Sequence, residues 1–102
     1  MIRVKNLNGS SKDDPPKGYS SWIGWWKGKK EEKGEKVPQK IECSAVNEHK
    51  DKKEEATDGA HVIKADKGQT KERYIVPLCH RCNETSKIFK VKKSDMEPIR
   101  SK

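Results

Sequence analysis

The chain has 102 residues, of which 29% are hydrophobic and 39% are charged, and its formal net charge is +8 at pH 7. This length allows one domain at most, and so small an apolar fraction predicts a core that needs a metal, disulfides or a partner chain for stability. No stretch approaches the roughly 20 apolar residues of a membrane span, and the first residues lack the apolar run of a signal peptide. Three cysteines cannot all pair, so we expect a reducing, cytoplasmic location.

The N-terminal segment, residues 1–18, is expected to form a strand and a loop. Residues 2–7 (IRVKNL) alternate apolar and polar side chains, which predicts a half-buried strand. The turn signal Asn8-Gly9 ends it, and the Pro-rich residues 10–18 predict a loop.

A tryptophan-rich helix is predicted next, with Ser20 or Ser21 as its cap. Trp22, Trp25 and Trp26 stand at positions i, i+3 and i+4, and therefore on one helix face. We expect these side chains to form core, because each can bury some 200 Å² and the chain has few other large apolar residues. The alternative is a platform on which nucleic-acid bases stack.

The middle of the chain is rich in Lys, Gly and Glu. Residues 27–36 carry no apolar side chain and predict a linker or a solvated helix end. Residues 37–43 predict a short extended segment that leads to a metal-binding knuckle, and residues 47–55 predict a long turn.

A second apolar cluster predicts a hairpin followed by a helix. Residues 61–64 and 73–76 are expected to be its strands, joined through residues 66–69, with Pro77-Leu78 ending the second strand. A helix is expected to begin near residues 79–82.

The C-terminal residues are basic. Residues 88–91 alternate as a last strand, and residues 96–99 are expected either to dock on the sheet or to be loose. We therefore place the main domain at residues 19–93 and a tail at residues 94–102. Residues 87–102 contain six basic and two acidic side chains, which favours a polyanionic partner such as nucleic acid.

Cys79 and Cys82 form the Cys-x-x-Cys of the chain, a spacing that suits two thiolate ligands of a tetrahedral zinc ion. At a helix start these thiolates gain from the helix dipole. Cys43 is a third candidate ligand. The histidines available for the fourth position are His49, His61 and His80. His49 gives a Cys-x5-His knuckle with Cys43 and is the ligand that we predict.

The stretches GAHVIKAD (59–66) and YIVPLCHRCNETSK (74–87) resemble the core of the HNH, or ββα-metal, endonucleases, which are built on a treble-clef zinc fold. A preceding Gly-Tyr-x-Ser-Trp segment and cysteine knuckle make the order similar to that of small bacterial proteins described as HNH-like. The resemblance covers about residues 15–92. It implies an α+β fold: a small treble-clef, HNH-like zinc domain with short β-hairpins and one or two short helices.

The resemblance also implies roles for single residues. His61 stands where these nucleases have the general base that activates water, and a Mg²⁺-type cation would stabilise the leaving oxygen. However, Ala60 precedes it and cannot bind a metal, Tyr74 stands where the family has an asparagine, and residues 85–87 offer no strong ligand. In the knuckle, relatives have a cysteine near His49, which supports His49 as the ligand.

The sequence therefore predicts a zinc-stabilised HNH-like domain that binds nucleic acid and has a degenerate catalytic centre. The alternatives are an active metal-dependent endonuclease with His61 as base, and a protein-interaction module. DNA is favoured over RNA as partner, no membrane association is expected, and the chain is expected to be a monomer. The residues predicted to contact phosphates are Lys71, Arg73, Arg81, Lys87, Lys90, Lys92 and Lys93.

Overall fold

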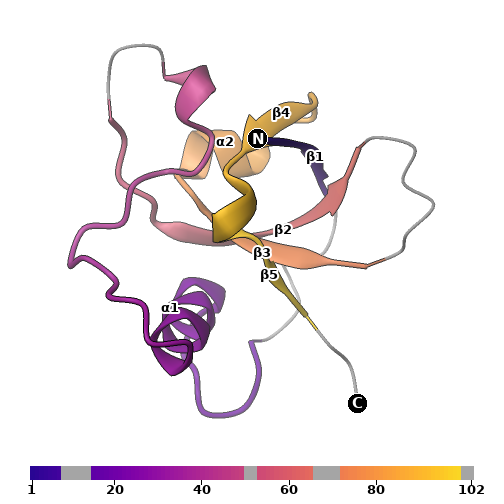
Figure 1. The fold of residues 1–102 in the computed structure, drawn as a ribbon. Coiled ribbons are helices and arrows are strands. Elements are labelled where there is room, and N and C mark those ends of the chain that lie inside the picture. The colour runs from indigo at the N-terminus through magenta and orange to yellow at the C-terminus, as the bar shows by residue number, and fades with distance from the viewer. Residues whose placement is uncertain (8–14, 50–52, 66–71, 100–102) are drawn as a thin grey trace.

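The computed structural model describes residues 1–7, 15–49, 53–65 and 72–99 (Figure 1). In this part of the chain a five-stranded antiparallel sheet combines with two α-helices and two short 3₁₀ turns in an α+β arrangement. The strands are β1 (Ile2–Asn6), β2 (Asp58–Lys64), β3 (Tyr74–Leu78), β4 (Phe89–Val91) and β5 (Glu97–Pro98). The helices are α1 (Trp22–Glu32) and α2 (His80–Glu84), and the 3₁₀ turns are η2 (Val46–Glu48) and η3 (Lys93–Asp95).

The strands follow the order β4-β1-β2-β3-β5 across the sheet. The predicted pair β2 and β3 lies side by side, with His61 opposite Ile75. The N-terminal strand β1 lies between β2 and β4, where Val4 is opposite Lys64 on one side and Phe89 on the other. The segments 1–18 and 94–102, which the sequence sets apart from the main domain, thus each contribute a strand to one sheet. The predicted turn at residues 8–9 and the hairpin connection at residues 66–69 lie outside the described residues.

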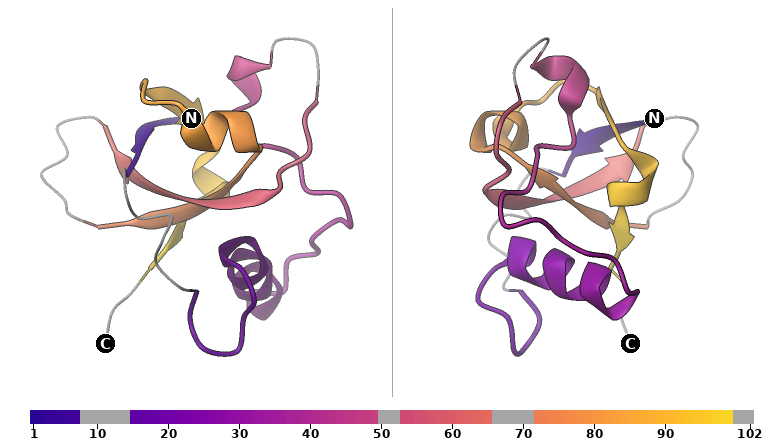
Figure 2. Two further views of the ribbon diagram at one scale, coloured as in Figure 1. Left: turned by 180° about the vertical axis from the view of Figure 1, so that it is seen from behind. Right: turned by 60° about the vertical axis from the view of Figure 1, so that its left-hand side comes forward.

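The sheet has a buried cluster on each face. On one face Ala60 and Val62 of β2 join the larger cluster, which also contains the three cysteines. On the other face Ile75 packs with Trp25 and Trp26 of α1. Figure 2 shows α1 on one side of β2 and β3, with α2 and η2 on the opposite side. Because side chains alternate along a strand, neighbouring residues of β2 face different layers.

Helix α1 begins as predicted, with Ser21 as its cap. The Ser21 hydroxyl accepts a hydrogen bond from the Gly24 backbone N–H at 3.1 Å. Trp25 and Trp26 are each 5% exposed, so the prediction that they form core is confirmed, whereas Trp22 is partly buried and packs against their cluster. The helix lies very close to β2 at Gly59, where a Cβ atom would stand 2.5 Å from the backbone nitrogen of Ile23.

The strand expected at residues 73–76 ends with Pro77-Leu78, as predicted, and both residues are part of β3. Pro77 lies inside β3 opposite Gly59, and β3 continues to Leu78. The Pro77 carbonyl accepts a hydrogen bond from the Ser44 backbone N–H at 2.8 Å, on the side of β3 away from β2. The proline nitrogen faces the same side, because the N and O of one strand residue point the same way. Proline is tolerated there, since no ladder hydrogen bond to β2 is lost.

The C-terminal segment docks on the sheet through β5 and on α1 through an ion pair. Glu97 is 3% exposed, and its carboxylate lies 3.0 Å from Lys30 Nζ and 2.9 Å from Lys33 Nζ. Nearby, the indole N–H of Trp26 donates to the Asp95 carbonyl at 2.6 Å. Of the two expectations for residues 96–99, docking is the one observed.

Candidate metal centre

The knuckle is held in place by the segment that follows it. The Cys43 backbone N–H donates to the Glu54 carbonyl at 2.7 Å, and the Ala56 N–H donates to the Ile41 carbonyl at 2.6 Å. On the other side of Cys43, the hydrogen bond from Ser44 to the Pro77 carbonyl attaches the knuckle to β3. The position of Cys43 is therefore fixed by backbone hydrogen bonds from two directions.

The turn η2 explains how a Cys-x5-His spacing can serve one metal ion. The Glu48 N–H donates to the Ala45 carbonyl and the His49 N–H to the Val46 carbonyl, at 3.0 and 3.2 Å. A 3₁₀ turn shortens the chain over these residues. It brings the imidazole of His49 back towards Cys43, although five residues separate them.

Helix α2 positions the other two cysteines. Cys79 is its N-cap residue and Cys82 lies in its first turn. The Asn83 N–H donates to the Cys79 carbonyl at 3.0 Å. The far end of this short helix is anchored to β1, because the Asn6 side-chain amide donates to the carbonyls of Cys82 and Thr85, each at 2.9 Å.

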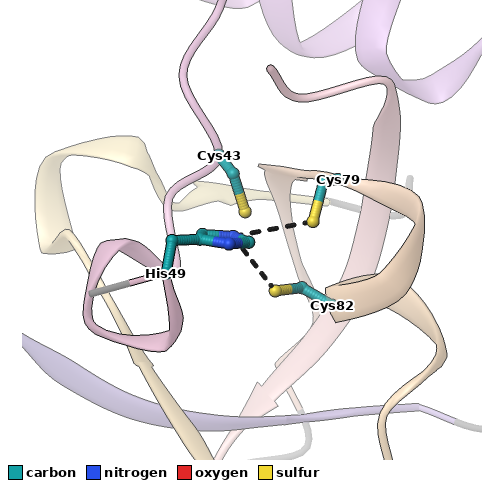
Figure 3. A group of neighbouring side chains, drawn as sticks. All are labelled: Cys43, His49, Cys79 and Cys82. Carbon is teal, nitrogen blue, oxygen red and sulfur yellow. Dashed lines mark hydrogen bonds between the residues drawn. The ribbon is translucent and has the colours of Figure 1, made fainter. Parts of the chain in front are cut away.

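The side chains of Cys43, His49, Cys79 and Cys82 converge on one point (Figure 3). Their candidate ligand atoms all lie within 4.8 Å of one another. His49 Nε2 is 3.6 Å from Cys79 Sγ and 3.5 Å from Cys82 Sγ. Ligands at zinc bond lengths of about 2.3 Å to sulfur and about 2.0 Å to nitrogen in a tetrahedron are roughly 3.5–3.8 Å apart. The spacing around His49 therefore fits a tetrahedral metal ion.

The four residues are between 0% and 8% exposed, so the site is closed to solvent. Burial raises the pKa of the Cys43 thiol and that of the Cys82 thiol. Buried thiolates require a strong positive charge beside them, which a divalent ion bound to the sulfur atoms supplies. A Cys₃His donor set is one of the usual sets of structural zinc sites.

Arg81 lies next to the cluster and contacts its histidine. Its guanidinium Nη2 is 2.9 Å from His49 Nδ1. Arginine can only donate, so this contact needs the tautomer with its proton on Nε2; a metal ion bound at Nε2 would place the proton on Nδ1 and end the contact. Three thiolates would exceed the charge of a divalent ion by one, and the guanidinium places a positive charge near them. The sequence predicted Arg81 as a phosphate contact and did not predict this position.

His61 lies on the opposite face of the sheet from the four clustered residues. It is 5% exposed, and its ring packs against Trp22 with centroids 4.6 Å apart in an edge-on arrangement. As a consequence, His49 and not His61 lies beside the cysteines. The role of His61 as general base stays a prediction.

His80 points away from the cluster, into solvent. Its Nδ1 is 3.1 Å from an Asp58 carboxylate oxygen, and its Nε2 is 3.2 Å from Glu84. The hydrogen bond to Asp58, together with the charge of Glu84, raises the pKa of His80. The same Asp58 oxygen accepts from the Asn83 amide at 3.0 Å, which links β2 to α2.

Of the basic residues predicted to contact phosphates, Lys71 lies outside the described residues. The other six are exposed: Arg73, Arg81, Lys87, Lys90, Lys92 and Lys93. That they contact phosphates stays a prediction. Lys87 pairs with Glu48, and Lys92 Nζ lies 3.9 Å from Glu42. Lys90 lies on β4 opposite Arg3 of β1. Arg3 was not among the predicted phosphate contacts, although the alternation in residues 2–7 places it on the polar face of a strand.

None of the helices in the described ranges is long and apolar enough to cross a membrane. Comparisons of the chain with models of protein families, with curated proteins and with solved structures give no match. The function is therefore argued from the residues and their geometry.

Proposed function

We propose that this chain is a zinc-stabilised, HNH-like domain that binds nucleic acid and has lost the catalytic centre of the HNH endonucleases. The observation that supports zinc is the buried convergence of Cys43, His49, Cys79 and Cys82. Four protein ligands leave no open position for water or substrate, which is the property of a structural rather than a catalytic zinc site.

The order of the elements supports the family part of the proposal. A knuckle supplies Cys43 and His49, the hairpin β2–β3 follows, and α2 supplies Cys79 and Cys82 from its first turn. A treble-clef zinc domain has the same sequence of knuckle, hairpin and helix. The metal would then join two segments that are far apart in the chain.

The surroundings of His61 support the loss of catalysis. A general base must come within hydrogen-bonding distance of the water that it activates. The His61 ring is buried against Trp22, and the side chain of its neighbour Ala60 has no atom that could bind a cation. Without a bound cation, little stabilises the charge that develops during phosphodiester cleavage.

The charge of the chain supports nucleic acid as partner. The formal net charge is +8, and exposed basic side chains occur on β1, β4 and η3. Contacts of lysine and arginine with phosphates release counterions, so the affinity should fall steeply as salt is added. DNA is the first partner to test.

The zinc site is tested by native mass spectrometry and circular dichroism of the wild type, His49→Ala and His80→Ala. We expect one tightly bound zinc ion in the wild type and in His80→Ala, and weak or absent zinc in His49→Ala. A structural zinc site contributes on the order of 10–16 kcal/mol of apparent binding free energy, so removal of the metal by a strong chelator should unfold the domain. A native spectrum in excess chelator would contradict the proposal.

Nucleic-acid binding is tested by fluorescence anisotropy with a labelled DNA at two salt concentrations, and cleavage with plasmid DNA in the presence of Mg²⁺. We expect salt-dependent binding and no nicking. Nicking that disappears in His61→Ala would instead establish an active nuclease. Absence of binding at micromolar protein concentrations would exclude nucleic acid as partner.

A further inference from the structure

Two strands that are far apart in the sequence bring basic side chains together on one face of the sheet. Arg3 of β1 and Lys90 of β4 are direct cross-strand partners. Their neighbours Val4 and Phe89 are buried in the cluster that contains the cysteines. Because side chains alternate along a strand, Arg3, Lys5 and Lys90 all project from the opposite face. We call these three residues the β1–β4 basic face.

The β1–β4 basic face is open to solvent. All three side chains are exposed. Helix α1 lies on this side of the sheet but packs on β2 and β3, and Figure 2 shows β1 and β4 away from it. On this face of the sheet, α1 therefore covers β2 and β3 with apolar side chains, whereas β1 and β4 present positive charge to solvent.

The spacing of these side chains suits a row of phosphates. Arg3 and Lys90 occupy directly opposite positions of an antiparallel pair, about 5 Å apart at their Cβ atoms, and Lys5 is about 7 Å further along the strand. This spacing is comparable with that of consecutive phosphates along a nucleic-acid strand.

A hollow of about 270 Å³ adjoins this face and has a partly apolar wall. Its lining comes from β1, β4, the residue before β4, and η2: Arg3, Asn47, Glu48, Ile88, Phe89 and Lys90. Ile88 is 46% exposed, which is unusual for so large an apolar side chain in this chain. Glu48, the acidic residue of the lining, is already paired with Lys87. The hollow thus combines two cations with an exposed apolar surface.

We infer that the β1–β4 basic face binds a single-stranded segment of nucleic acid, with phosphates on Arg3, Lys5 and Lys90 and a base in the hollow beside Ile88. This inference rests on the proposed function and specifies its surface and its substrate class. A single strand is favoured because its bases can leave the stack and reach an apolar hollow. In a duplex the bases are stacked inside, and the phosphates are the groups that would meet this face.

The test compares two variants that each lose three positive charges. One is the triple variant Arg3→Gln, Lys5→Gln and Lys90→Gln. The matched control is the triple variant Lys17→Gln, Lys27→Gln and Lys36→Gln, which changes three exposed lysines at and around α1. Binding of each protein to a labelled single-stranded oligonucleotide and to the duplex of the same sequence is measured by anisotropy over a range of salt concentrations.

We expect the wild type to bind the single strand more tightly than the duplex. The basic-face variant should lose at least tenfold in affinity, and its plot of log affinity against log salt should be shallower by about 2, since each lost contact with a single strand removes about 0.7. The control variant should retain most of the slope. Ile88→Ser should weaken binding of the single strand and leave duplex binding unchanged.

The outcomes that contradict the inference differ from those that contradict the proposed function. If the wild type binds nucleic acid but both triple variants lose affinity equally, or if the duplex binds as tightly as the single strand, the surface assigned here is wrong and the proposed function stands. If the zinc-loaded wild type binds neither the single strand nor the duplex, both the inference and the proposed function are wrong. Equal zinc content and equal circular dichroism in all variants ensure that a lost affinity is not a lost fold.

Discussion

The close approach of α1 to β2 predicts that Gly59→Ala is strongly destabilising. A Cβ atom at this position would lie 2.5 Å from the backbone nitrogen of Ile23 and 2.5 Å from the backbone carbonyl carbon of Trp22. Ordinary van der Waals contacts of a Cβ atom are 3.4–4 Å. The helix would therefore have to move outward by about 1 Å, because backbone atoms cannot rotate out of the way as a flexible side chain can.

The cost follows from what this movement disturbs. Overpacking of a core by one methyl group costs about 1–3 kcal/mol, and contact with backbone places this case at the upper end. The displaced helix also carries Trp25 and Trp26, whose packing on Ile75 would loosen. For a domain of this size about 3 kcal/mol corresponds to a decrease in Tm of roughly 10–20 °C.

The assay is thermal unfolding of the zinc-loaded protein followed by circular dichroism, with Gly24→Ala as control. Gly24 lies inside α1, and a Cβ atom there would meet only the Ser21 hydroxyl at 3.2 Å. The helix gains about 1 kcal/mol from alanine at such a position, which offsets this contact. Gly59→Ala should have the same metal content as the wild type, because the four clustered residues lie on the other face of the sheet. A Tm equal to that of the wild type would refute the close packing of α1 on β2.

Two further predictions concern the contacts between α1 and the C-terminal segment. Burial alone would raise the pKa of Glu97, but the hydrogen bonds and charges of Lys33 and Lys30 outweigh it and hold that pKa below its ordinary value. The stabilisation is therefore complete above the ordinary pKa of glutamate and is lost as the pH falls through the lower folded pKa. Glu97→Gln should lower the free energy of unfolding by up to about 3–5 kcal/mol at neutral pH. In urea unfolding, this difference between variant and wild type should shrink near pH 3. A difference that stays constant with pH would contradict an ionised Glu97 in the folded protein. Trp26→Phe removes the hydrogen bond to the Asp95 carbonyl and should cost about 1–3 kcal/mol in the same assay, whereas an unchanged urea midpoint would show that this bond contributes nothing.

Local patterns predicted much of the fold and of the candidate site. The spacing of Cys79 and Cys82 is a property of one helix turn, and the alternation in residues 2–7 is a property of one strand, so both are visible in the sequence. The tryptophans at i, i+3 and i+4 likewise identify one buried helix face. In each case the residues that decide the structure are close neighbours in the chain.

The features that the sequence did not reveal depend on contacts between distant residues. Alternation identifies β1 as a strand but does not say that β4 is its neighbour, so the meeting of Arg3 with Lys90 was not predictable. The pairing of Lys87 with Glu48 similarly depends on where η2 packs. The reason why β3 tolerates Pro77 also depends on which side of the strand its nitrogen faces, and only the tertiary arrangement determines that side.

The place of β1 in the sheet has a consequence for folding during synthesis. β1 is made first, yet one of its two neighbours is β4, where Ile2 lies opposite Val91. β1 and β4 cannot pair until residues near the other end of the described chain have emerged from the ribosome. The strand made first therefore lacks one of its neighbours until nearly the whole domain has been synthesised. Contacts between such distant residues also slow folding in general. Nascent chains that stall before β4 should therefore expose the edge of β1 that pairs with β4 and be sensitive to protease, even when the four candidate ligand side chains have already emerged.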